Sequence, residues 1–164
     1  MPQNEEMLHQ VLGLAQWDAL PDFGLYMDQV IVLIERALEG VLPKGGLTKS
    51  MVNNYVKVGL IPRPAGKKYD REHLALLLMI CILKQALSME EIAALLGMLC
   101  RCSVRSGYER FLNEVVALRE AAISGRIDLW LEPADGEHQA LRAGVIAAIC
   151  TIVAREMIRT AKKG

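Results

Sequence analysis

The stretch Leu47-Thr48-Lys49-Ser50-Met51-Val52-Asn53-Asn54-Tyr55-Val56-Lys57-Val58-Gly59-Leu60-Ile61-Pro62 predicts a short helix with a sharp boundary at each end. Thr48 can cap the first turn, because its side-chain oxygen can accept from a backbone N–H that lacks a partner within the helix. Leu47 and Val52 flank this cap as a hydrophobic staple. Gly59 suits a left-handed C-terminal cap, and a proline follows where a helix cannot continue.

This expected helix has two different faces. Polar residues at i, i+3, i+4 and i+7 form one face: Ser50, Asn53, Asn54 and Lys57. Apolar residues repeat on the other face: Met51, Tyr55 and Val58. A polar face rich in amides is what a recognition helix presents to base edges and phosphates in the major groove of DNA. The same spacing is also typical of an ordinary solvated face.

The residues that follow predict a basic loop and two further helices. Pro62–Tyr69 contains two prolines, a glycine and three basic residues, and it has the length of a small wing. Asp70 is expected to cap a helix from Arg71, and Ser88 with Glu91 forms a capping box for the next one. Leu74–Leu83 is apolar throughout, which predicts a helix that is buried on nearly all sides. The buried stripe of the helix after it comprises Ile92, Leu95, Leu96 and Leu99.

Three segments carry a resemblance to known regulators: Asn54–Pro62, Lys68-Tyr69 and Leu83–Ile92. They resemble the DNA-binding domain of MerR-type winged-helix regulators. The chain looks more closely like a bacterial family, known as a domain of unknown function, that shares this MerR-like core. Asp28-Gln29 and Leu47–Lys57 carry that second similarity, which covers about Leu20 to Leu99. It implies a winged helix-turn-helix core with a small wing. The patterns after Leu99 predict a C-terminal helical pair, so we expect an all-α chain.

The resemblance implies a DNA-binding transcription regulator. The residues expected to face the major groove or its phosphates are Lys49, Asn53, Asn54, Tyr55 and Lys57. Those expected to form the wing and hold backbone phosphates are Arg63, Lys67, Lys68 and Tyr69. The chain departs from the MerR pattern twice, with Asn53-Asn54-Tyr55 in place of Arg-Tyr-Tyr and with Gly40–Gly46 in place of a tight turn. The missing arginine favours an alternative: a non-enzymatic protein-interaction module that kept the fold but does not bind DNA.

The net charge of zero conceals a segregation of charge. Residues 1–46 contain seven acidic and two basic side chains, whereas residues 47–71 contain six basic side chains and one acidic one. A local basic cluster can bind phosphate in a neutral protein, because the Debye length at physiological salt is only about 8 Å. Alternatively, these bases pair with the acidic N-terminal segment.

The sequence divides into three parts. Residues 1–24 are expected to form an N-terminal helix from Asn4 and a linker, and 25–99 the MerR-like domain, whose first helix spans about Tyr26 to Leu38. Residues 100–164 form a helical bundle or dimerisation region. The expected core anchors of the first two parts are Trp17, Phe23 and Tyr26.

The C-terminal part supplies the argument for a dimer. Ser106 and Glu109 form a capping box for one helix, and a last helix runs from about Glu137 to Thr160. Its run Ala143–Ala154 contains one polar residue, so this helix must pack inside a bundle or against a second copy. We therefore expect a homodimer through the C-terminal helices, with a monomeric bundle as the alternative.

No catalytic motif is present in the sequence, and we expect neither an enzyme, nor a cofactor, nor a metal site. Cys100 and Cys102 are too few for a metal-binding set, and Cys81 and Cys150 lie in apolar runs that suggest reduced core residues. The residues at the N-terminus do not resemble a signal peptide, and the longest apolar helix is too short to span a bilayer. We therefore expect a cytoplasmic protein without a membrane partner.

Overall fold

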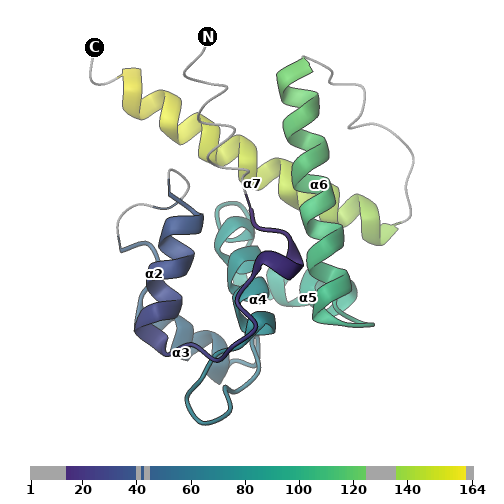
Figure 1. The fold of residues 1–164 in the computed structure, drawn as a ribbon. Coiled ribbons are helices and arrows are strands. Elements are labelled where there is room, and N and C mark those ends of the chain that lie inside the picture. The colour runs from purple at the N-terminus through teal and green to yellow at the C-terminus, as the bar shows by residue number, and fades with distance from the viewer. Residues whose placement is uncertain (1–13, 40–41, 43–44, 125–135, 162–164) are drawn as a thin grey trace.

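The described residues of the computed structural model, 14–39, 42, 45–124 and 136–161, form six α-helices and one short 3-10 helix (Figure 1). The elements are η1 Trp17–Ala19, α2 Met27–Ala37, α3 Lys49–Lys57, α4 Arg71–Leu83, α5 Met89–Leu99, α6 Val104–Ser124 and α7 Gly136–Ala161. These residues contain isolated β-bridges but no strand, which confirms the expected all-α class. The helix expected from Asn4 and the loop expected after Gly125 lie outside the described residues.

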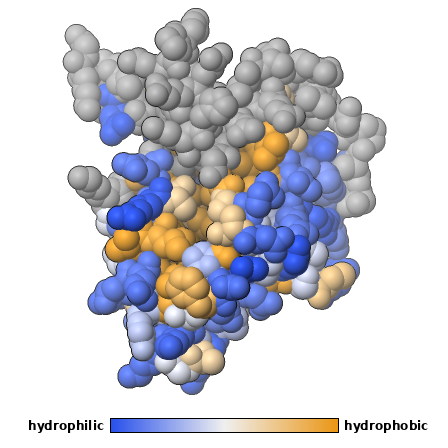
Figure 2. Space-filling model, viewed as in Figure 1, coloured by the Kyte–Doolittle hydropathy of each residue, from blue (hydrophilic) through white to orange (hydrophobic). Residues whose placement is uncertain are grey.

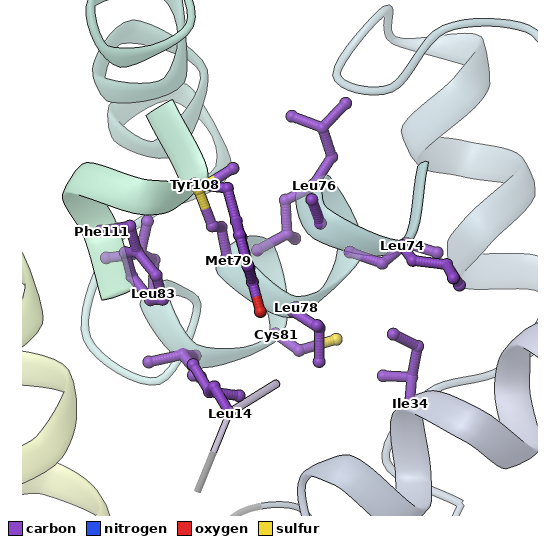
Figure 3. Close-up of a cluster of buried hydrophobic side chains, with 14 of the residues drawn as sticks. Leu14, Ile34, Leu74, Leu76, Leu78, Met79, Cys81, Leu83, Tyr108 and Phe111 are labelled. Atoms are coloured by element: carbon purple, nitrogen blue, oxygen red, sulfur yellow. The ribbon is translucent and has the colours of Figure 1, made fainter. Parts of the chain in front are cut away.

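Helix α4 is the centre of the core. All residues from His73 to Leu83 are buried, as the apolar run predicts. Figure 3 shows side chains projecting from α4 on several sides, toward Ile34 of α2 on one side and Tyr108 and Phe111 of α6 on the other. A helix surrounded in this way gains most of its stability from packing rather than from its own propensity.

The expected start signals hold for two helices and fail for a third. Asp70 and Ser88 accept hydrogen bonds from the backbone N–H three residues later, and so they cap α4 and α5. Helix α6 instead begins at Val104, because the Ser103 hydroxyl accepts from the Ser106 N–H at 3.0 Å. The prediction that Ser106 and Glu109 form its capping box is therefore wrong. Both serines offer a capping hydroxyl, and the earlier one is used.

Helix α7 packs onto its own chain. Gly144 allows the close approach, since a Cβ there would lie 3.2 Å from the Leu87 side chain. The residues of α7 that are buried against α4, α5 and α6 are Leu141, Val145, Ala148, Ile149 and Ile152. Much of the apolar run that suggested a dimer is thus covered within one chain. No helix in the described part of the chain combines the length and hydropathy needed to traverse a bilayer.

Arg71 fixes the acidic N-terminal segment to the start of α4. Its Nε donates to the Leu20 carbonyl oxygen at 3.0 Å, and its terminal nitrogens lie 3.7 Å from Asp18 and 3.9 Å from Asp22. The guanidinium also lies 5.9 Å from the centre of the buried Trp17 ring. Trp17 is therefore a core anchor, as predicted. The acidic residues beside it, Asp18 and Asp22, pair with Arg71.

Candidate nucleic-acid interface

Both ends of α3 are fixed by the signals seen in the sequence. The Thr48 hydroxyl accepts from the Met51 N–H at 3.2 Å. At the other end, the N–H of Leu60 donates to the Tyr55 carbonyl at 2.8 Å, and Gly59 has a left-handed φ of 75°. This pairing is a Schellman motif, which satisfies carbonyls that the helix leaves open. Helix α3 is therefore held as a short rigid unit.

The two faces of α3 differ in burial. Val52 and Tyr55 are 0% and 4% exposed, whereas Asn53, Asn54 and Lys57 lie on the surface. Lys49 and Ser50 are exposed as well. Val58 was expected on the apolar face, but it is 61% exposed because the chain leaves the helix there. The helix thus presents two amides and two lysines outward.

The loop between α3 and α4 ends in a tight hairpin turn. The Lys68 N–H donates to the Ala65 carbonyl at 2.9 Å, and these two residues form an antiparallel bridge. Gly66 and Lys67, the central residues, have φ angles of 56° and 62°. Positive φ at both central positions is the signature of a type I′ turn. The tip and the approach to it are exposed, with Arg63, Lys67 and Lys68 on the surface.

The base of this loop is joined to the segment that precedes α2. Leu25 and Tyr69 exchange two backbone hydrogen bonds of 2.8 Å each. Next to them, Asp70 caps α4 and its Oδ1 lies 2.6 Å from Nδ1 of His73. Burial alone would raise the pKa of Asp70, but hydrogen bonds from the His73 side chain and backbone lower it below its ordinary value. The basic tip therefore rests on a well-anchored base.

Two of the residues expected to contact DNA lie in the core. Tyr55 and Tyr69 are each 4% exposed, so the expectation that they lie on the outer surface is wrong. Burial, with a smaller contribution from the Cys81 thiolate, raises the pKa of Tyr55 to about 12. Burial also raises the pKa of Tyr69. Tyr55 follows the buried Val52 by three positions, and that helical spacing places both on the inner face.

Two aromatic residues that sequence reasoning placed in the core are on the surface instead. Phe23 and Tyr26 are 64% and 56% exposed, which corrects the prediction that they anchor the core. Lys68 Nζ lies 5.6 Å from the centre of the Tyr26 ring, a cation–π distance. Gly24 leaves the space for this contact, since a Cβ there would come within 2.8 Å of Lys68 Cβ. The only signal in the sequence is the position of Tyr26 immediately before a helix.

The basic cluster is divided between paired and unpaired cations. Lys49 Nζ lies 2.6 Å from Asp28, and Arg71 faces Asp18 and Asp22. The other four bases of residues 47–71 have no ion pair within the described part of the chain: Lys57, Arg63, Lys67 and Lys68. The alternative that these bases pair with the acidic N-terminal segment therefore holds for Lys49 and Arg71 and does not hold for the other four. Figure 2 shows that the end of the molecule with the α3–α4 loop is mostly hydrophilic, while hydrophobic residues gather in the middle of that view.

The four cysteines differ in burial. Among the described residues, no three His, Cys, Asp or Glu side chains are grouped as metal ligands. Cys100 is half-buried under Gly107, and burial, followed by the Glu72 carboxylate, raises the pKa of its thiol. Cys81 is buried as predicted, whereas Cys150 is exposed on α7 and not in the core.

The comparisons with known proteins give one match. Residues 15–116 match a family described as a domain of unknown function (DUF1836), which covers more than half of the chain. The matched range contains α2 to α5, the α3–α4 loop and the first half of α6. No curated protein and no solved structure matches the chain.

Proposed function

The chain belongs to the DUF1836 family, and we propose that it is a transcription regulator that binds double-stranded DNA through α3 and the α3–α4 loop. In this proposal α2 and α3 form a MerR-like helix-turn-helix. The loop hairpin with its bridge to Leu25 is the wing. The proposal gives a role to an exposed and basic part of the matched range.

One observation carries the proposal: exposed cations without ion-pair partners lie on α3 and the α3–α4 loop, and two exposed amides lie on the same rigid helix α3. Lys57, Arg63, Lys67 and Lys68 are the cations, and the amides belong to Asn53 and Asn54. Phosphate contacts supply most of the affinity of DNA-binding proteins, whereas side-chain amides can read an adenine edge. A surface that combines cations with amides is therefore suited to DNA, whereas an acidic peptide would require only the cations.

The proposed contacts fall into two groups. The wing binds backbone phosphates through Lys67, Lys68 and Arg63. Helix α3 binds further phosphates through Lys57 and Lys49. Asn53 and Asn54 enter the major groove and supply the sequence preference. Tyr55 and Tyr69 support these contacts from the core, where they position α3 and the base of the wing. Tyr26 takes part by holding Lys68.

Salt dependence tests the proposal. Binding to a mixed-sequence duplex, followed by fluorescence anisotropy at several salt concentrations, should give a slope of log K against log salt of about −4.5 for five neutralised phosphates. Replacing Lys67 and Lys68 together by alanine should flatten this slope by about two units. Replacing Asn53 and Asn54 by alanine should leave the slope unchanged and reduce selectivity among duplexes.

A cation at the other end of the molecule provides the matched control. Arg155 on α7 is exposed, and its guanidinium donates to the Gln85 side chain at 2.7 Å. Figure 1 shows α7 at the opposite end of the molecule from the α3–α4 loop. Arg155→Gln removes one positive charge, as each wing substitution does, but it should not change the slope. Absence of binding to any duplex at low salt would remove the regulator proposal.

The proposed assembly is a homodimer through α7. The outer side of this helix carries an apolar stripe at 3-4-3 spacing that α4, α5 and α6 do not fully cover: Ala143, Ile146, Cys150 and Val153. Two such stripes can pack about a two-fold axis and place two copies of α3 one duplex turn apart, about 34 Å. Sedimentation velocity of the full chain measures this assembly directly.

A second candidate function is a protein-interaction module that keeps the fold and does not bind DNA. The observation that favours it is the apolar side chain of Val58, 61% exposed beside the amides of α3. The salt titration separates the two candidates. An interaction module would show no duplex affinity that depends on Lys67 and Lys68.

A further inference from the structure

A groove of 510 Å³ lies between the C-terminal end of α3 and the outer face of α5. Its walls are mostly apolar and come from the α3 cap, α5 and the start of α6. The apolar residues at its edges are Val58, Leu60, Met89, Ala93, Gly97 and Val104. Its volume falls within the range of about 300–1,000 Å³ that is usual for small-molecule sites.

The groove is open because side chains are missing from its walls. Gly97 follows Ala93 by one helical turn, and both residues lie on the exposed face of α5. A Cβ at Gly97 would meet no atom within 4 Å, and the same is true at Gly59. Leu76 and Leu96, which lie beneath, are each 5% exposed and close the bottom. The floor is therefore apolar, while the mouth faces solvent.

One carboxylate stands at this mouth. Glu90 is exposed and has no ion-pair partner within the described part of the chain. The other polar groups in the lining are the Asn54 amide and the Cys100 thiol, and no aromatic ring lines the groove. The complement of these walls is an apolar body with one positive end that can donate hydrogen bonds. An ammonium group meets this requirement better than a quaternary amine, which usually binds to aromatic rings.

We propose that this groove binds a small apolar molecule that carries an ammonium group, with Glu90 pairing with the charge and α5 holding the apolar part. The site shares Asn54 with the exposed face of α3. A bound molecule restrains Asn54 and the α3 cap, so its presence lowers the affinity for DNA, and DNA lowers its affinity by the same factor. This coupling rests on the proposed DNA binding, whereas the ligand site does not.

Three probes of equal chain length test the site without DNA. Hexylammonium, hexan-1-ol and hexane-1-sulfonate are titrated into the ¹⁵N-labelled full chain, and the amide signals of Gly59 and Gly97 are followed. Hexylammonium should give saturable shifts at both signals. The alcohol should bind up to about fivefold more weakly, the factor expected for an exposed ion pair. The sulfonate should give no saturable shift. Equal binding of all three probes, or none of any, would overturn the proposal.

Two variants assign the binding to the groove. Glu90→Gln should reduce the affinity for hexylammonium to that of the alcohol. Gly97→Leu should fill the groove and abolish the binding of both probes, and it should not unfold the chain, because the position is open and leucine favours a helix more than glycine does. Ala94→Leu adds the same side chain to an exposed position of α5 outside the groove and serves as the control.

Two outcomes of these variants would overturn the ligand site. Unchanged hexylammonium binding in Gly97→Leu would place the molecule elsewhere. A change of oligomeric state in Gly97→Leu, measured by sedimentation, would assign the groove to a second copy of the chain.

The coupling has a separate readout. Saturating hexylammonium should weaken the binding of duplex DNA to the wild-type chain more than it weakens the binding of duplex DNA to Gly97→Leu. The variant serves as the control for direct competition between the amine and the protein for DNA phosphates. Equal weakening in both would overturn the coupling. If the chain binds hexylammonium but no duplex, the DNA-binding proposal fails and the ligand site remains.

Discussion

Lys67 occupies a backbone conformation that suits asparagine better than lysine. Its φ of 62° lies in the left-handed region, where a Cβ costs roughly 1–2 kcal/mol in most residues. Asparagine tolerates this region, because its short side chain can bond to the local backbone. The Lys67 side chain is exposed and makes no hydrogen bond or ion pair within the described part of the chain, so its removal forfeits little.

Lys67→Asn is therefore expected to stabilise the fold while it weakens DNA binding. The free energy of unfolding should rise by about 1 kcal/mol. For a chain of this size that corresponds to an increase in Tm of about 2–4 °C. The loss of one cation should at the same time flatten the salt slope of DNA binding by about 0.9. Chemical denaturation, differential scanning calorimetry and fluorescence anisotropy measure the three quantities.

Lys67→Ala is the matched control for the strain. Alanine removes the same charge but lacks the side-chain amide that lets asparagine bond to the local backbone at this φ, so the stability should stay within about 0.5 kcal/mol of the wild type. The salt slope should fall as it does for asparagine. Equal stability of the two variants would show that the turn stores no strain at Lys67, and it would refute the reasoning.

Three further outcomes are expected. His73 lowers the folded-state pKa of Asp70 below its ordinary value of 3.8. The stabilising contribution of Asp70 is therefore complete at neutral pH and is lost as the pH falls through that lowered value. The Tm measured between pH 6 and 2.5 should fall less steeply in Asp70→Asn than in the wild type. Gly107→Ala should lower the stability by about 1–3 kcal/mol, because its Cβ would lie 2.6 Å from a cysteine sulfur, whereas Gly97→Ala should raise it by up to about 1 kcal/mol; a higher denaturant midpoint for Gly107→Ala, or a lower one for Gly97→Ala, would contradict the corresponding assignment. Copper-phenanthroline oxidation should link two chains through Cys150 and give a covalent dimer on a non-reducing gel. This dimer should be lost in Cys150→Ser. If the wild-type chain also remains monomeric after oxidation, the result would count against the α7 dimer.

The sequence predicts helices well where a start signal and an apolar pattern agree. Helix α2 begins one residue after the expected start, and α4 is buried along the whole apolar run. Helix α6 begins earlier than expected, because Ser103 and Ser106 can both cap a helix and the structure uses the Ser103 hydroxyl. An apolar pattern therefore predicts the presence of a helix more reliably than it predicts the first residue of that helix.

The aromatic residues show what the sequence does not contain. Trp17 and Tyr26 are both large rings in the N-terminal segment, yet one is 8% and the other 56% exposed. The difference comes from contacts with distant residues, since Arg71 and Tyr108 cover Trp17 while Lys68 leaves one side of Tyr26 open. Such long-range contacts leave no trace in the spacing of either residue. The exposed polar face of α3 was predictable, whereas the role of Tyr26 beside it was not.

The separation of paired from unpaired cations explains how a neutral chain can present a basic surface. Arg71 lies among the acids of the N-terminal segment, so those acids are neutralised at the start of α4 and not on the wing. Lys49 is close to Asp28, but both side chains are mostly exposed, and such a pair is worth only about 0–1 kcal/mol. A phosphate can replace that partner at little cost. The remaining cations act over about one Debye length, some 8 Å, so the proposed function requires that the affinity for DNA arise from contact and not from long-range attraction by the whole molecule.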